Sequence, residues 1–324
     1  MKASLVRLCD EEPFEVFRFS RTILEVSRYS NRMFKNLKYW LGLGLEMRRF
    51  IIINDINPDR FRLTLLRMQA SLTGKKAEVE EAGDFLKWLS QRLLPKENFE
   101  LIRVGGKHDG GYHLLEMSNI KLLFSAGIGK NCDFEDEMTN LTEAQIIACD
   151  PTISRYPNYN PSSQINFEKR WFTSSHSCDH EVKICLAEID INGFPPNSTS
   201  LLKMDIEGSE HDILYYDWDE ISKFDQLIIE FHDFYRLADT KFRLETQQIF
   251  EKILQDFTCV SFHSNNWAPM LNFGHSFCPD IFEVTLVKNA YLEKTPTVKR
   301  EILSAVHQSN NPNLADLPNS IFSI

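Results

Sequence analysis

The stretch LLKMDIEGSEHDIL, residues 201–214, decides how the rest of the chain is interpreted. An apolar run ends at Asp205, a turn follows at Gly208, and apolar residues then return. This pattern predicts a buried strand that leads directly into a helix, as in the strand–helix units of a parallel sheet. Asp205 and Glu207 then lie at the carboxyl end of the strand, where open parallel sheets bind their ligands.

Short apolar runs recur from about residue 98 to residue 288 and alternate with helical stretches. Most of them carry no charge in their interior and end in Gly, Asp or His, as strands buried on both faces do. The predicted fold class is therefore α/β, with a Rossmann-like, doubly wound and mainly parallel sheet. The run FEVTLVK (282–288) follows its predecessor closely, which predicts an antiparallel pair at the edge of the sheet.

The spacing of apolar residues changes near residue 95 and again near residue 290, which predicts three regions. Residues 1–95 show helical spacing and form a helical N-terminal accessory region, whose last helix (AEVEEAGDFLKWLSQRLL) ends before Pro95. Residues 96–290 form the α/β domain, and residues 291–324 form a C-terminal tail, with a short helix and a loose end. The N-terminal helices are expected to pack on the main domain or on a partner chain, including a second copy of this chain.

Composition and charge exclude several classes of protein. The formal net charge of −10 repels phosphate backbones, so nucleic acid is not expected as a partner. No apolar run approaches the roughly 18 to 20 residues that cross a bilayer, so no membrane span is predicted. Seven cysteines without a CxxC pair indicate reduced thiols, and the start of the chain lacks the features of a secretory signal. A cytoplasmic protein is expected.

A second ligand-binding pattern follows the run KLLF (121–124). Gly127 and Gly129 form a G-x-G at a predicted strand-to-helix turn, where glycine lets the backbone bend sharply and lets a ligand approach closely. Asp150 ends the next apolar run, about 20 residues further on, where an acid can bind both hydroxyls of a ribose. The alternative is that Asp150 only caps the following turn. Cys132 replaces the third glycine of a dinucleotide fingerprint, which favours a nucleoside without pyrophosphate, such as S-adenosylmethionine (SAM).

Several segments resemble, in their order along the chain, the FkbM-type SAM-dependent methyltransferases. They are RVGGKHDGGYHLL (103–115), LLFSAGIGKNCDFEDEM (122–138), LLKMDIEGSEHDIL (201–214), LIIEFHDF (227–234), FHSNNW (262–267) and FEVTLVK (282–288). The D-G-G-Y segment is similar to one branch of that family. The resemblance implies a methyltransferase domain over residues 96–290, SAM as cofactor, and methyl transfer to oxygen. The implied acceptor is a sugar, a glycan or another small polar metabolite, in surface-glycan or natural-product biosynthesis.

Two residues at strand ends are candidates for catalysis. Asp205 is the candidate general base, and His232 is its rival because histidine has an unperturbed pKa near neutrality. Glu207 is expected to accept hydrogen bonds from the amides of the turn or to bind the amino group of SAM. Glu210 is expected to be a first-turn acid that favours the helix dipole. A requirement for a metal ion stays open.

The remaining candidates are contacts for the cofactor and the acceptor. The cofactor contacts implied by the resemblance are Arg103, Asp109, Gly111, Tyr112, Ser125, Gly127, Gly129, Asp150 and Glu207. Ser125 stands where many methyltransferases carry an acid. The candidate acceptor contacts, which offer an imidazole and two amides to hydroxyl groups, are His263, Asn265 and Asn266. A simple loop turn is the alternative for these three.

Two other functions compete with methyl transfer. An NAD-linked dehydrogenase has the same fold class, but Cys132 at the place of the third glycine disfavours it. A non-catalytic scaffold or binding protein of this fold is expected to lack acids at the strand ends. Asp150, Asp205 and His232 are present, which disfavours that alternative.

Overall fold

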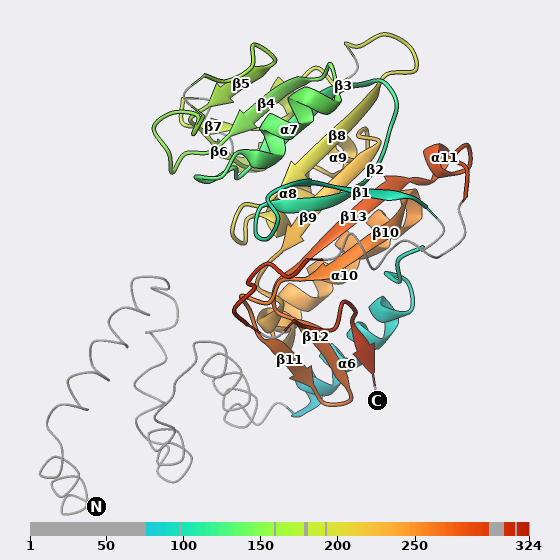
Figure 1. The fold of residues 1–324 in the computed structure, drawn as a ribbon. Helices are drawn as coiled ribbons and strands as arrows, with labels where there is room; N and C mark the ends of the chain where they lie inside the picture. The colour runs from blue at the N-terminus through green and yellow to red at the C-terminus, as the bar shows by residue number, and fades with distance from the viewer. Residues whose placement is uncertain are drawn as a thin grey trace, which may run out of the picture. The chain divides into compact units, whose positions relative to one another are not determined.

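The structure is a computed structural model that describes residues 76–96, 99–158, 160–177, 181–191, 193–297, 308–314 and 316–323. These residues form a mixed α/β domain around a seven-stranded, mostly parallel sheet (Figure 1). The predicted accessory helices over residues 1–75 lie outside the described residues. Among the described helices, none is both long and apolar enough to cross a membrane.

The central sheet has one switch in strand order. Its strands are, in spatial order, β10 (Phe257–Ser264), β13 (Phe282–Lys288), β9 (Gln226–Phe231), β8 (Thr199–Met204), β3 (Ile120–Ala126), β4 (Gln145–Cys149) and β5 (Ile165–Glu168). The strands from β9 to β5 pair in parallel, whereas β13 is antiparallel to both β9 and β10. The antiparallel pair predicted for FEVTLVK is therefore confirmed. From β3 the chain continues to β4 and β5 and then returns to the other side of β3 at β8, so the order switches between β3 and β8.

Two apolar cores cover the two faces of the sheet. Successive residues of a strand point to opposite faces, so Leu202 and Met204 of β8 belong to one core and Leu201 to the other. The first core includes residues of α8 (Glu210–Tyr216), α9 (Trp218–Ile221) and α10 (Thr240–Asp256). The second includes residues of α7 (Asp133–Leu141) and of the hairpin β1 (Leu101–Gly105) and β2 (Gly111–Leu115). Layers on both faces agree with the predicted fold class.

The face under the β1–β2 hairpin becomes polar toward the carboxyl ends of the strands. Pairing places Ser125 beside Lys203, Glu230 beside Glu283, and Glu283 beside His263. All five are buried. Strand β2 packs against β9, β10 and β13, so the hairpin covers this polar row.

Helix α6 (Lys76–Ser90) belongs to the core of the α/β domain. It presents Ala82, Phe85, Leu86 and Leu89 at helical spacing, and all four are buried. The helix packs against α10 and against a small sheet of β11 (Met270–Phe273), β12 (Ser276–Pro279) and β14 (Phe322–Ser323). The last helix of the predicted accessory region thus packs on the main domain.

The remaining short elements connect β5 to β8 and β9 to α10. The first connection contains β6 (Trp171–Phe172), η2 (Ser175–Ser177), β7 (Lys183–Ile184) and η3 (Leu186–Glu188), and the second contains η4 (Phe234–Ala238). Strands β6 and β7 pair with each other in parallel.

The C-terminal tail is attached to the domain, contrary to the loose end expected from its composition. Helix α11 (Asn289–Leu292) lies where the predicted tail begins, and the short helix expected within the tail stays a prediction. Further along, Asn310 and Asn311 are buried, and β14 pairs with β12. Side-chain contacts between distant segments, which composition does not reveal, hold this tail in place.

Leu89→Ala is expected to destabilise the protein by about 2–5 kcal/mol, because it truncates a fully buried side chain of α6. Lys87→Ala, on the exposed face of the same helix, is the matched control and should change stability by less than about 0.5 kcal/mol. Denaturant unfolding of the full chain measures both. Equal unfolding midpoints for the two variants would show that α6 is not part of the core.

Candidate active site at the strand ends

The carboxyl ends of β3 and β8 meet at Gly127. This residue has a φ of +77°, and its amide donates a hydrogen bond to the carbonyl oxygen of Cys149 at 2.9 Å. A Cβ atom at residue 127 would collide with the carbonyl oxygen of Asp205, so only glycine lets the two strand ends come this close. The glycine turn and Asp205 therefore share the edge of the sheet at which ligands of open α/β sheets bind.

Gly129 and Asp150 lie together at the same edge. The amide of Gly129 donates to Oδ2 of Asp150 at 2.7 Å, and Oδ1 accepts from the amide and the hydroxyl of Thr152 at 2.7 and 2.6 Å. The turn-capping role of Asp150 is thus present. It uses both acceptor sites of Oδ1 and one of Oδ2, so the second site of Oδ2 is left for a ligand. Beyond its chain neighbours, Gly129 has no atom within 4 Å of the place where a Cβ atom would stand.

Asp205 lies between the hairpin and the end of β8. Its Oδ2 accepts a hydrogen bond from the hydroxyl of Tyr112 at 2.8 Å. The ammonium group of Lys203 lies 5.1 Å from the centre of the Tyr112 ring and donates to the carbonyl oxygen of Gly127 at 2.8 Å. Tyr112 and Lys203 thus connect Asp205 to the hairpin and to the glycine turn.

Asp205 and the two carboxyl groups of the polar row, Glu230 and Glu283, have different pKa shifts. Burial alone would raise the pKa of Asp205, but the charge of Lys203 and a hydrogen bond from Glu230 lower it below its usual value. Burial, together with the nearby charges of Asp205 and Glu283, raises the pKa of Glu230 well above its usual value. Burial also raises the pKa of Glu283 to about 8. At neutral pH Asp205 therefore carries the negative charge, while Glu230 and Glu283 keep their protons.

His232 is a cation at neutral pH. Its Nδ1 lies 3.0 Å from Oε1 of Glu210, and its Nε2 lies 3.6 Å from Oε2 of Glu207. Burial lowers the pKa of His232, but the hydrogen bond and charge of Glu210, with smaller effects of Asp205 and Glu207, raise it to about 9. Because both ring nitrogens already carry protons, this arrangement does not support His232 as the general base at neutral pH.

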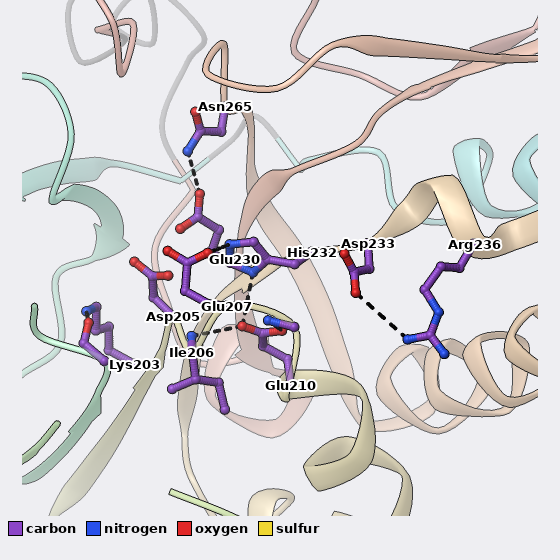
Figure 2. A network of polar contacts seen from close by, with 12 residues as sticks. Lys203, Asp205, Ile206, Glu207, Glu210, Glu230, His232, Asp233, Arg236 and Asn265 are labelled. Carbon is purple, nitrogen blue, oxygen red and sulfur yellow. Dashed lines mark hydrogen bonds and ion pairs between the residues drawn. The ribbon is translucent and has the colours of Figure 1, made fainter. Parts of the chain in front are cut away.

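Glu210, not Glu207, binds the amides of the turn (Figure 2). Its carboxylate accepts from the amide of Ile206 at 2.8 Å and from the amide of Gly208 at 3.0 Å. Glu207 has a φ of +56°, and its side chain is 88% exposed and directed toward His232. The structural role expected for Glu207 therefore belongs to Glu210, which is buried and does more than favour the helix dipole.

Asp205, Glu207 and His232 each place one potential ligand atom within 4.8 Å of the other two. In the absence of a metal ion, His232 lies 3.6 Å from Glu207, and its charge lowers the pKa of Asp205, so the three are a group of opposite charges. We assign no metal to them.

The hairpin residues hold the turn that brings Tyr112 to Asp205. Arg103 donates from Nε to the carbonyl oxygen of Gly106 at 3.3 Å and from Nη2 to that of His108 at 2.6 Å. Gly111 packs closely against the guanidinium group of Arg103, and Asp109 lies exposed in the turn. Direct contacts of Arg103, Asp109 and Gly111 with a cofactor stay predictions.

Ser125 and Asn265 both hydrogen-bond to buried carboxyl groups. The hydroxyl of Ser125 donates to Glu135, in the first turn of α7, and Ser125 is fully buried. The amide of Asn265 donates to Oε1 of Glu230 at 2.6 Å, as Figure 2 shows. The arrangement does not favour Ser125 as a direct cofactor contact, whereas Asn265 reaches the carboxyl group that hydrogen-bonds to Asp205.

His263 and Asn266 bind the C-terminal segment. Nε2 of His263 lies 2.7 Å from Oδ1 of Asn310, whose Nδ2 donates to Glu283 at 2.7 Å. The side-chain amide of Asn266 donates to the carbonyl oxygen of Asn311 at 2.9 Å and accepts from its amide at 2.7 Å. Since these groups are buried and bound within the chain, this arrangement does not favour acceptor roles for His263 and Asn266.

The sequence interpretation assigned no role to Lys203, Glu230 or Glu283. Each is a charged residue inside an apolar run, and each is buried in its strand. A charge in the interior of a buried strand costs free energy unless it is paired, so it is a signal of a polar site. That signal was present in the runs LLKM, LIIEF and FEVTL.

Asn310→Ala should destabilise the protein by about 1–3 kcal/mol, because it takes one hydrogen-bond partner from each of two buried groups, His263 and Glu283. Asn313→Ala, at an exposed position in the same segment, serves as the control and should have little effect. Thermal and denaturant unfolding report the difference. A loss no larger than that of the control would mean that the tail is not held by Asn310.

Residues 97–256 match the model of the methyltransferase FkbM domain. The match ends at the last residue of α10, so β10 and β13, which carry His263 and Glu283, lie beyond it. A comparison with curated proteins finds no match to this chain.

Proposed function

We propose that the protein transfers a methyl group from SAM to a hydroxyl oxygen of a sugar or another small polar metabolite. The match of residues 97–256 to the methyltransferase FkbM domain supports the reaction class. One observation carries the proposal. Gly127, Gly129 and Asp150 meet Asp205 at the switch in strand order, where an α/β sheet binds a nucleoside.

The residues at this edge fit SAM. Gly129 leaves space beside its backbone, and Asp150 offers a carboxylate for the ribose hydroxyls. The carboxylates of Asp205 and Glu207 suit a cofactor that carries positive charge on its sulfur and its amino group. When bound, SAM supplies a methyl group on a sulfonium, which is already a good leaving group. Cys132, which is buried, stands where NAD-binding proteins have their third glycine.

Asp205 is the proposed proton acceptor. It is ionised at neutral pH, and the hydroxyl of Tyr112 fixes its orientation. A carboxylate of low pKa is a weak base, but the proton of an acceptor hydroxyl becomes strongly acidic as its oxygen bonds to the methyl carbon. A weak base in the right place therefore suffices for a late proton transfer.

The charge of the site supports an acceptor without phosphate or carboxylate groups. Lys203, Arg103 and His232 already bind a carbonyl oxygen of the glycine turn, carbonyl oxygens of the hairpin turn, and Glu210, respectively. An anionic acceptor would face Asp205 and Glu207 while these cations are engaged elsewhere. A sugar hydroxyl, glycan or similar neutral group, as the family resemblance implies, meets no such repulsion.

The proposal also covers the cellular compartment of the protein and its association with a second copy. The described cysteines, Cys132, Cys149, Cys185, Cys259 and Cys278, are free thiols, which supports a cytoplasmic protein. The N-terminal helices are proposed to join two copies of the chain.

Calorimetry should show that SAM binds and that NAD does not. Asp150→Ala should weaken SAM binding by about tenfold or more, because hydrogen bonds to a charged group contribute about 1.5–3 kcal/mol. Asp212→Asn, at an exposed acid of α8, is the control and should leave the affinity unchanged. Binding of NAD without binding of SAM would overturn the choice of cofactor.

Asp205→Asn should lower turnover by about a hundredfold or more if Asp205 accepts the proton. The measurement is transfer of a labelled methyl group from SAM to a panel of neutral sugars and glycans. Asp233→Asn removes a neighbouring acid and keeps a residue type that tolerates the φ of +65° at this position, so it is the matched control. Wild-type turnover in Asp205→Asn would remove Asp205 from the mechanism.

A further inference from the structure

The carboxylate of Glu210 forms hydrogen bonds with residues that follow two neighbouring strands, β8 and β9. Glu210 is the first residue of α8, and its side chain is 2% exposed. It accepts hydrogen bonds from the amides of Ile206 and Gly208, which follow β8, and it binds Nδ1 of His232, which follows β9. Figure 2 shows Glu210 between the turn and the His232 ring. Three of the roughly four acceptor sites of the carboxylate are therefore used within the chain.

The two amides bound by Glu210 flank Glu207. Glu207 adopts a left-handed conformation, which costs a residue other than glycine on the order of 1–3 kcal/mol and persists only where the surroundings impose it. The hydrogen bonds from Ile206 and Gly208 to one buried carboxylate supply that constraint. In this conformation the exposed side chain of Glu207 is directed toward His232, with Oε2 at 3.6 Å from Nε2.

The hydrogen bond from His232 to Glu210 fixes the ring. With Nδ1 held by Glu210, the other nitrogen, Nε2, faces Glu207. The charged groups around the ring are Glu210 from α8, and Asp205 and Glu207 from the end of β8. Next to it in sequence, Asp233 forms an ion pair with Arg236 at 3.8 Å.

Capping of the helix alone does not account for Glu210. An exposed acid in the first turn interacts with the helix dipole as favourably as a buried one. Asp212, whose side chain is 81% exposed, is already such an acid in α8. Burial of a charge is costly and is offset only by well-placed hydrogen bonds and an opposite charge. Glu210 has both, and its partners are the residues that flank Asp205.

We infer that Glu210 is a positioning residue: its carboxylate holds the turn of residues 205–208 and the ring of His232 in one arrangement beside Asp205. This inference rests on the proposed function for its consequence in catalysis. The arrangement itself can be tested without any reaction.

The test is the titration of His232, followed by NMR in the cofactor-free full chain. In the wild type His232 should titrate near pH 9, and in Glu210→Gln its pKa should fall toward the unperturbed value of about 6.5. Glutamine keeps the volume of the side chain but removes its charge. Asp212→Asn, which removes a charge from the exposed side of the same helix, should leave the titration of His232 unchanged.

The pH dependence of stability is a second test of the interaction between Glu210 and His232. Because the pKa of His232 is raised in the folded state, its contribution to stability is fully present below about pH 6.5 and is lost as the pH rises through about 9. Glu210→Gln should therefore destabilise the protein more at pH 6 than at pH 10. The extra loss at pH 6 should be absent in Asp212→Asn.

The kinetics of Glu210→Gln are a third test of the positioning role. Glu210→Gln should lower kcat on the order of tenfold to a hundredfold, with a smaller change in KM, and should move the alkaline limb of the rate profile to lower pH. Absence of SAM binding by the folded wild type would refute the proposed function and leave the titration result standing.

Two results would overturn the positioning role. One is an unchanged titration of His232 in Glu210→Gln. The other is titration of His232 near pH 6.5 in the wild type, which decides the question even if Glu210→Gln does not fold.

Discussion

The site depends on the close approach of β3 and β8, whose carboxyl ends would collide at Asp205 if residue 127 carried a side chain. This approach brings the glycine turn after β3 and the acids after β8 to one edge of the sheet. The parallel pairing of β3 with β4 adds Asp150 to the same edge. The residues proposed to bind the cofactor and to accept the proton are thus brought together by one contact between backbones.

Burial under the hairpin separates the pKa values of three neighbouring carboxyl groups. Asp205, Glu230 and Glu283 lie close together, and burial keeps the last two protonated. Lys203 and His232 surround the remaining carboxylate with positive charge, and Tyr112 closes the site from the hairpin. The hydrogen bond and charge of Glu210, with smaller effects of Asp205 and Glu207, raise the pKa of His232 to about 9, which disfavours this histidine as a base near neutral pH.

The sequence predicted the parts of the site that depend on local pattern. Short apolar runs are followed directly by Gly127, Gly129 and Asp150. Parallel strands bring their carboxyl ends to one edge of the sheet, and this does not depend on the structure of the rest of the chain. His263 and Asn266 could not be interpreted in this way, because their partners Asn310 and Asn311 lie 47 and 45 residues away along the chain. That Glu210, and not Glu207, binds the amides of the turn was also hidden. Both are acids of one short turn, and only its folded path shows which one reaches the amides.

The family match covers the part of the chain up to α10, and the structure adds elements on both sides of it. Helix α6 and the C-terminal segment pack on the same domain, and the latter binds the polar row through Asn310. A crystal structure with S-adenosylhomocysteine tests the central claim most directly. The account requires the ribose hydroxyls at Asp150 and the sulfur facing Asp205 across the glycine turn. A ligand bound elsewhere, with Asp150 and Asp205 directed away from it, would contradict the account.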